Sequence, residues 1–123
     1  MDLFRDESFV SHAGLRLEFK VECDALSDGS LETLAKRVGR HFIFGRVYGV
    51  ARGGLRLAAA LEKFRAPNCQ TTLIVDDVFT TGMSMEKARR EIGEDSIGIV
   101  VWARSKCPSW IHPINQLADW AGP

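Results

Sequence analysis

Two adjacent carboxylates, Asp76 and Asp77, follow three apolar residues in the segment Leu-Ile-Val-Asp-Asp-Val-Phe-Thr-Thr-Gly-Met-Ser, which spans residues 73–84. The apolar residues are typical of a buried strand, and a helical pattern begins at about Ser84. The turn between them offers backbone N–H groups and hydroxyls at a helix N-terminus, where the helix dipole favours an anion. Carboxylates do not bind phosphate, but they suit sugar hydroxyls or a hydrated cation. This order of residue types predicts a sugar-phosphate site; the alternative is a buried strand that ends in an Asp-rich turn.

A second glycine-containing turn, Val-Ala-Arg-Gly-Gly at residues 50–54, also opens a predicted helix. Paired glycines let backbone amides turn toward phosphate oxygens, and Arg52 supplies a fixed positive charge with bidentate geometry. A Gly-Gly helix start is on its own more often only a tight turn. It gains weight here because it lies one strand–helix unit before the two acids.

Alternating strands and helices position these two turns. The pattern predicts strands at 47–50, 72–76 and 97–103, with helices before the first and between the others. Ser27 or Ser30 caps the first helix, and Pro67 stops the second. The apolar helix positions are Leu31, Leu34, Ala35, Val38 and Phe42, then Leu57, Ala58, Leu61 and Phe64, then Met85, Ala88 and Ile92. This order predicts an α/β fold: a parallel sheet flanked by helices, with right-handed crossovers and both turns at the carboxyl ends of strands.

The two ends of the chain fall outside this pattern. Residues 15–23 alternate between apolar and charged side chains, as a half-buried strand does, and residues 8–11 are a short candidate partner. The tail from Arg104 is irregular. We therefore expect a single domain over residues 1–123, with its core at about 27–103 and a small hood from about 8–24 and 104–123.

Composition narrows the class of partner and the compartment. The chain carries 16 basic and 16 acidic side chains, and this balance argues against nucleic acid or an acidic membrane surface as a partner. Cys23, Cys69 and Cys107 are widely spaced and odd in number, which favours reduced thiols over disulfides or a metal site. The charged N-terminus does not fit a signal peptide, and no apolar run is long enough for a bilayer. We expect a cytoplasmic protein.

Residues 73–84 closely resemble the phosphoribosyl pyrophosphate (PRPP) motif of type I phosphoribosyltransferases, and residues 50–54 resemble their pyrophosphate loop. The resemblance implies that Asp76 and Asp77 hold the ribose hydroxyls and, indirectly, Mg²⁺, and that with Arg52 they form the catalytic set. It also implies a non-proline cis peptide at Ala51–Arg52. The implied phosphate ligands are Thr80, Thr81, Gly82, Met83 and Ser84 for the ribose 5′-phosphate and Ala51, Arg52, Gly53 and Gly54 for the pyrophosphate.

Orotate phosphoribosyltransferases are the members of that family with the most similar pattern. Their N-terminal hood has a Lys-Ser-Gly turn, which the His-Ala-Gly of residues 12–14 resembles with two replacements. The resemblance implies that His12 and Arg104 contact the base; the alternatives are a solvated histidine in a turn and a solvated arginine at a strand end. Three tryptophans are candidates for a base-pocket floor or for core packing: Trp102, Trp110 and Trp120.

One element of the family is missing from this chain. An extra strand and a long mobile loop normally precede the acidic motif; in orotate enzymes the loop brings a catalytic lysine, often across a dimer interface. Here only a helix and residues 65–71 intervene. Such a lid excludes water and completes the catalytic set.

The resemblance thus implies a minimal, lidless phosphoribosyltransferase. It would bind PRPP with Mg²⁺ and an orotate-like nitrogenous base, release pyrophosphate, and form a homodimer. A non-catalytic PRPP or nucleotide sensor of the same fold is the alternative, and a structural protein with a vestigial site is a third. Fold alone does not choose among these three.

Overall fold

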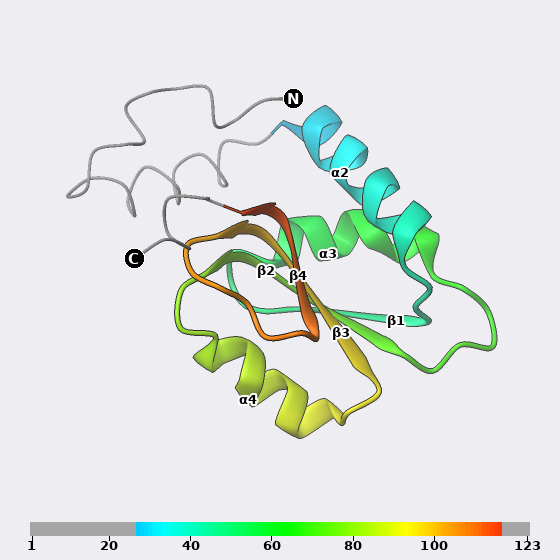
Figure 1. Ribbon diagram of the computed structural model, residues 1–123. Helices are drawn as coiled ribbons and strands as arrows, with labels where there is room; N and C mark the ends of the chain where they lie inside the picture. The colour runs from blue at the N-terminus through cyan, green and yellow to red at the C-terminus, as the bar shows by residue number, and fades with distance from the viewer. Residues whose placement is uncertain (1–26, 117–123) are drawn as a thin grey trace.

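A computed structural model describes residues 27–116 of the chain. Its centre is a four-stranded sheet in the order β1-β2-β3-β4, in which all neighbouring strands are parallel. Figure 1 shows helices on both sides of the sheet. This arrangement of a parallel sheet with helices on both faces confirms the predicted α/β fold class.

From α2 to β3 the helices and strands follow the predicted order. The strands are β1 (Arg46–Gly49), β2 (Thr72–Phe79), β3 (Ser96–Ala103) and β4 (Ile111–Gln116). The helices are α2 (Asp28–His41), α3 (Leu55–Leu61), the 3₁₀ turn η2 (Glu62–Phe64) and α4 (Met83–Ile92). The main difference is in β2, which runs three residues past the predicted end at Asp76 and therefore contains both acids.

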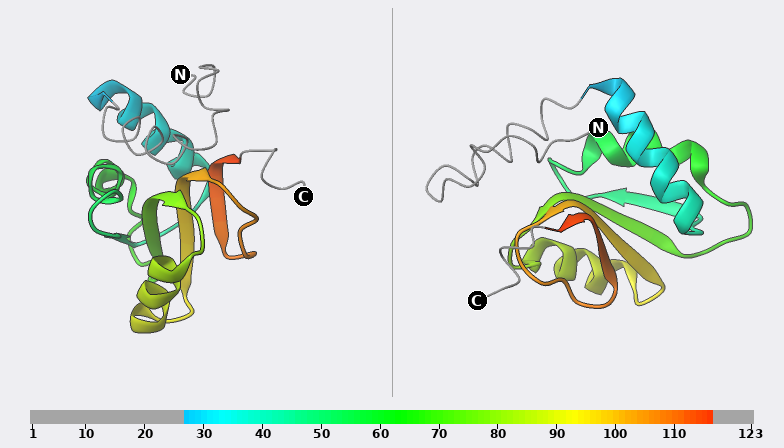
Figure 2. Two further views of the ribbon diagram at one scale, coloured as in Figure 1. Left: turned by 90° about the vertical axis from the view of Figure 1, so that its left-hand side faces the viewer. Right: turned by 45° about the horizontal axis from the view of Figure 1, so that its top comes forward.

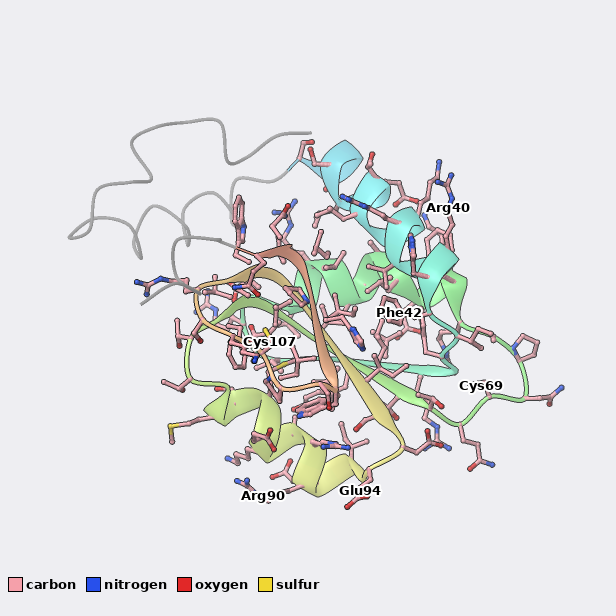
Figure 3. The ribbon with its side chains drawn as sticks, viewed as in Figure 1. Arg40, Phe42, Cys69, Arg90, Glu94 and Cys107 are labelled. Carbon is pink, nitrogen blue, oxygen red and sulfur yellow. The ribbon has the colours of Figure 1, made fainter. Side chains whose placement is uncertain are left out.

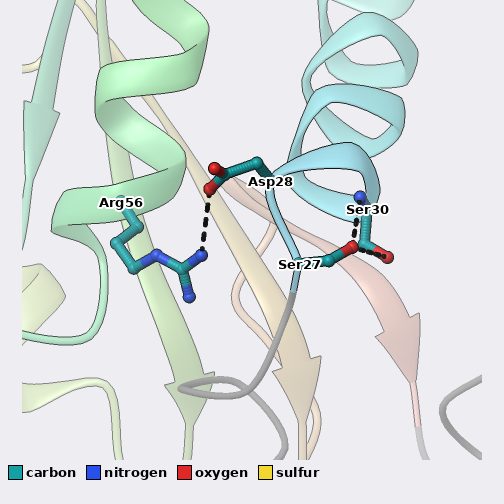
Figure 4. Close-up of polar contacts among 4 residues, drawn as sticks. All are labelled: Ser27, Asp28, Ser30 and Arg56. Carbon is teal, nitrogen blue, oxygen red and sulfur yellow. Dashed lines mark hydrogen bonds and ion pairs between the residues drawn. The ribbon is translucent and has the colours of Figure 1, made fainter.

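The N-terminus of α2 shows why the chain becomes helical at this point. The Ser27 side chain caps the helix by accepting a hydrogen bond of 3.0 Å from the Ser30 N–H, as Figure 4 shows. Asp28 in the first turn reaches Arg56 of α3 at 3.4 Å and joins the two helices at their surface. Both groups are well exposed, so this ion pair contributes little to stability.

An apolar layer covers each face of the sheet. The strand period of two sends Leu73 and Val75 toward α2 and α3, and sends Ile74 toward α4. Figure 2 shows the same division, with α2 and α3 above the sheet and α4 below it. The α2 and α3 stripes are buried as predicted, except for their last members, Phe42 and Phe64, which are partly buried.

The hand of one crossover differs from the prediction. Because β1, β2 and β3 are consecutive neighbours, crossovers on opposite faces of the sheet must have opposite hands. In the views of Figures 1 and 2 the β2-α4-β3 unit has the usual right hand, and the β1-α3-β2 unit is left-handed. The physical reason is that α3 packs against α2 and therefore stays on the same face of the sheet as α2. From there the chain passes directly to β2, without the extra strand of the resembled family.

The C-terminal segment also corrects a prediction. Residues 111–116 form β4, the edge strand beside β3, and are not part of a hood. Pro113 lies within β4, where it is tolerated because an edge strand does not need every N–H for pairing. The predicted hood elements at 8–24 and 117–123 lie outside the described residues.

The connection from α3 to β2 is short and is held by hydrogen bonds to the residues just before β1. The Arg65 side chain donates to the Gly45 carbonyl at 2.7 Å, and the Ala66 N–H donates to the Phe44 carbonyl at 2.7 Å. Residues 65–71 therefore pack on the start of β1, and in the described part of the chain no lid precedes β2. None of the described helices has the length and apolar character that a bilayer crossing needs.

Candidate functional site

Three loops meet at the carboxyl edge of the sheet. The Gly-Gly loop (residues 50–54) follows β1, the phosphate loop (residues 80–84) follows β2, and residues 104–106 follow β3. The Val50 N–H donates to the Val75 carbonyl at 2.8 Å, and the Arg104 N–H donates to the Phe79 carbonyl at 2.9 Å. Ligands in parallel α/β sheets bind at this edge, so the tertiary structure places the predicted turns where a shared ligand is expected.

The phosphate loop owes its shape to one glycine. Gly82 has a φ of 80°, in the left-handed region that favours glycine, and an added Cβ would lie 2.6 Å from the Phe79 ring. This turn starts α4, whose first internal backbone bond runs from the Glu86 N–H to the Gly82 carbonyl at 2.8 Å. The N–H groups of the first turn of α4 have no acceptor within the helix, and that of Met83 donates to Thr81 Oγ1 at 3.4 Å.

A small pocket opens at this helix start. Its volume is about 70 Å³, well above the roughly 10–15 Å³ that one water requires on this kind of measure, so it has room for a phosphate-sized group. It brings together Asp76 and all five predicted 5′-phosphate ligands. The lining residues are Asp76, Val78, Phe79, Thr80, Thr81, Gly82, Met83, Ser84 and Met85.

The two acids have different surroundings. Asp76 is half-buried and lines the pocket, whereas Asp77 is only 6% exposed and does not line it. The Asp77 N–H donates to Asp76 Oδ1 at 2.8 Å, and the Val78 N–H donates to Asp77 Oδ1 at 2.7 Å. Asp77 is thus buried within β2, where Gly53 packs against its carboxylate, and is not in the turn that follows the strand.

The Gly-Gly loop lies directly on β2. A Cβ on Gly53 would lie 2.1 Å from Asp77 Oδ2, and one on Gly54 would lie 2.1 Å from the Val75 carbonyl oxygen. Only glycine allows these close approaches. Arg52 is exposed, and the Ala51–Arg52 peptide bond is cis, which confirms the expectation drawn from the family resemblance.

Of the two predicted base contacts, only Arg104 lies in the described part of the chain. His12 lies outside the described residues, and Arg104 is half-buried just after β3. Trp102 is fully buried in the core beneath α2 and α3. Trp110 packs on α4, where its Nε1–H donates to Glu86 at 3.1 Å and Arg89 lies 4.7 Å from its ring. Both tryptophans are packing residues; Trp120 lies outside the described residues.

Ser105 is a site neighbour that sequence reasoning missed. Its hydroxyl donates to the Thr80 carbonyl at 2.6 Å and ties the loop after β3 to the phosphate loop. The Gln116 side chain in turn donates to the Ser105 carbonyl at 3.3 Å. The sequence offered only a weak indication of this role, because Ser105 is simply a polar residue two positions after the end of a buried strand.

A groove and two free thiols are further features of the described residues. A groove of about 250 Å³ runs between the end of α2 and the start of β4, where the Phe42 and His112 rings lie 4.9 Å apart. Figure 3 marks Phe42 and the free thiols Cys69 and Cys107. Partial burial raises the pKa of the Cys107 thiol, which disfavours the nucleophilic thiolate and argues against a catalytic role.

The carboxylates fit Mg²⁺ only with help from a ligand. Within residues 27–116 no group of three acidic, histidine or cysteine side chains converges as a metal cage. Mg²⁺ usually keeps several waters and binds through one or two carboxylates together with substrate phosphates. Asp76, beside the phosphate loop, meets that description, so a Mg²⁺ ion is expected to arrive with a phosphorylated ligand.

Comparison with known proteins supports the fold and leaves the activity open. No family profile and no curated protein sequence matches the chain. Among solved structures, the UMP synthase of Leishmania donovani matches over 91% of this chain with a TM-score of 0.57 and 15% sequence identity. The chain spans 29% of the length of that protein. Together with the parallel sheet and its flanking helices, this likeness assigns the chain a fold like that of type I phosphoribosyltransferases.

Proposed function

We propose that the protein binds PRPP with Mg²⁺ and transfers the phosphoribosyl group to a nitrogenous base, releasing pyrophosphate. The observation that carries this proposal is the pocket at the start of α4, where Asp76 and the phosphate loop share one small space. Backbone N–H groups at a helix N-terminus suit a phosphate, and a carboxylate beside them suits the hydroxyls of the attached sugar.

The site divides the proposed substrate between the two loops. The ribose 5′-phosphate would bind at residues 80–84, the ribose at Asp76, and the pyrophosphate at residues 51–54 with Arg52. In the reaction a base nitrogen forms a bond to C1 of the ribose and gives up its proton to water or to the leaving pyrophosphate. The C1–oxygen bond breaks, and pyrophosphate leaves with the bonding electrons. Bound Mg²⁺ would neutralise pyrophosphate charge, and Arg52 would add a second positive group.

A pyrimidine-like base such as orotate is the favoured acceptor. The structural neighbour is named for the synthesis of UMP, which is a ribose 5′-phosphate that carries a pyrimidine base. Arg104, which follows the strand adjacent to β2, is the residue that we propose to meet a negatively charged base. We extend the proposal to a cytoplasmic homodimer, as in the resembled family.

A non-catalytic PRPP or nucleotide sensor is the second candidate. The specific observation in its favour is the short, pinned connection before β2, which leaves no lid in the described part of the chain. Lids exclude water during group transfer, whereas binding alone does not need one.

Calorimetric titration with PRPP and Mg²⁺ tests the common part of both candidates. A turnover assay with a panel of bases that includes orotate then separates them. Binding with turnover supports the transferase, and binding without turnover on any base supports the sensor. Absence of PRPP binding would contradict both and leave a vestigial site in a structural protein.

A further inference from the structure

We infer that the two acids have different tasks: Asp76 is the ligand group, and Asp77 is a positioning residue that holds the Gly-Gly loop in place over β2. The inference rests on the proposed function for the identity of the ligands. It departs from the expectation that both carboxylates bind the ribose.

The burial of the two side chains separates them first. Both acids lie within β2, which continues to Phe79. Asp76 lines the pocket with the phosphate loop, whereas Asp77 is 6% exposed and is absent from its lining. A ligand in that pocket therefore meets the Asp76 carboxylate and not the Asp77 carboxylate.

The contacts of Asp77 then show what its carboxylate does. Oδ1 accepts a hydrogen bond of 2.7 Å from the Val78 N–H, which fixes the side chain to the β2 backbone. On the other side, a Cβ on Gly53 would lie 2.1 Å from Oδ2 and 2.2 Å from Cγ. The carboxylate is therefore packed between the main chain of β2 and the main chain of Gly53.

This packing makes Asp77 a spacer between β2 and the Gly-Gly loop. The Gly-Gly loop rests on β2 at two adjacent points, Gly54 on the Val75 carbonyl and Gly53 on Asp77. Removing the Asp77 carboxylate would leave the second point unsupported, next to the exposed Arg52. The pyrophosphate end of the substrate should therefore depend on Asp77, while the ribose 5′-phosphate end should not.

Three variants test this division: Asp77→Ala, Asp77→Asn and Asp76→Asn. Each is titrated with ribose 5-phosphate, with Mg²⁺ and pyrophosphate, and with Mg²⁺ and PRPP, after thermal unfolding has shown that it folds. We expect Asp77→Ala to lower the affinity for pyrophosphate and for PRPP at least about tenfold. Its affinity for ribose 5-phosphate should stay within about twofold of the parent's. Asp77→Asn keeps the shape of the side chain and should retain most of the parent's affinity for both ligands. Asp76→Asn should weaken ribose 5-phosphate.

A second measurement reads the position of the loop without any ligand. Tryptic cleavage after Arg52 and amide exchange of residues 51–54 report local opening. Both should be at least about tenfold faster in Asp77→Ala than in the parent, in Asp77→Asn or in Asp76→Asn. If the parent binds no ligand, the proposed function fails, while this measurement still decides the role of Asp77. If Asp77→Ala does not fold, Asp77→Ser, which also removes the carboxylate, takes its place with the same expectations.

Two outcomes would overturn the inference. One is an Asp77→Asn protein that loses ribose 5-phosphate as strongly as Asp76→Asn does, because Asp77 would then be a ribose ligand. The other is a Gly-Gly loop with unchanged exchange and cleavage in Asp77→Ala, because the loop would then hold its position without the carboxylate.

Discussion

The two loops at the carboxyl edge both contain glycine and both precede a helix, yet they are built differently. The Gly-Gly loop is held by close packing on β2, where the Val75 carbonyl and the Asp77 carboxylate leave no room for a side chain. The phosphate loop is shaped by its own backbone through the positive φ of Gly82, and it encloses a small pocket. Similar glycine patterns thus serve different needs: tertiary contact in the first loop and local conformation in the second.

The largest expected effect comes from changing both acids, because Asp76 lies beside the phosphate loop and Asp77 packs against the Gly-Gly loop. Replacing Asp76 with Asn and Asp77 with Ala in one variant should lower PRPP affinity by roughly two to three powers of ten, because the first change removes a charge-assisted hydrogen bond of about 1.5–3 kcal/mol and the second adds the loss of about tenfold expected from the unsupported Gly-Gly loop. Calorimetry with Mg²⁺ measures this loss. Ile99→Val, a buried change in β3, is the matched control and should alter stability alone. Unchanged PRPP affinity in the double variant would contradict the assignment of the acids to the site.

Gly54→Ala tests whether packing shapes the Gly-Gly loop. The new Cβ would meet a main-chain oxygen that cannot move aside cheaply, so we expect a loss of about 3 kcal/mol in the free energy of unfolding, measured by urea denaturation. Gly29→Ala in α2 is the control: its Cβ would meet only the Ser27 hydroxyl at 3.9 Å, so stability should stay equal or rise by up to about 1 kcal/mol. Equal effects at the two positions would remove the distinction between the loops.

Gly82→Ala tests whether backbone conformation shapes the phosphate loop. A side chain in the left-handed region costs roughly 1–2 kcal/mol, to which the contact with the Phe79 ring adds. Thermal unfolding should report this loss, and phosphate binding should weaken with it. Gly82→Asn should lose less, because Asn tolerates this conformation better. If Asn is as harmful as Ala, the ring contact and not the φ angle governs this position.

Ser105→Ala should have the smallest effect. It removes one hydrogen bond to the Thr80 carbonyl at an exposed position, with an expected loss of about 0.5–1.5 kcal/mol in stability. Phosphate affinity should fall by less than about tenfold. Thr33→Ala, which removes an exposed hydroxyl contact within α2 at 3.0 Å, is the control and should leave phosphate affinity unchanged. A loss of phosphate affinity in the control would show that general destabilisation is being measured.

Local patterns determined the elements and their order. The apolar stripe of α2 with its Ser27 cap, the buried run of β3 and the helix start near Ser84 follow from periods of 3.6 and 2 and from capping chemistry. The α/β class, the placement of both loops at strand ends and the cis peptide at Ala51–Arg52 were likewise predicted, the last from the family resemblance. Each of these depends on neighbours in sequence or on a recognisable motif.

Only the tertiary structure decided which contacts form between distant segments. The left-handed crossover depends on α2 holding α3 to one face, and the place of residues 111–116 as a strand depends on the open edge of β3. The different surroundings of Asp76 and Asp77 arise because β2 runs past both of them while Gly53 closes over the second. Adjacent residues of the same type look equivalent in a sequence, and the packing of another segment against one of them makes them different.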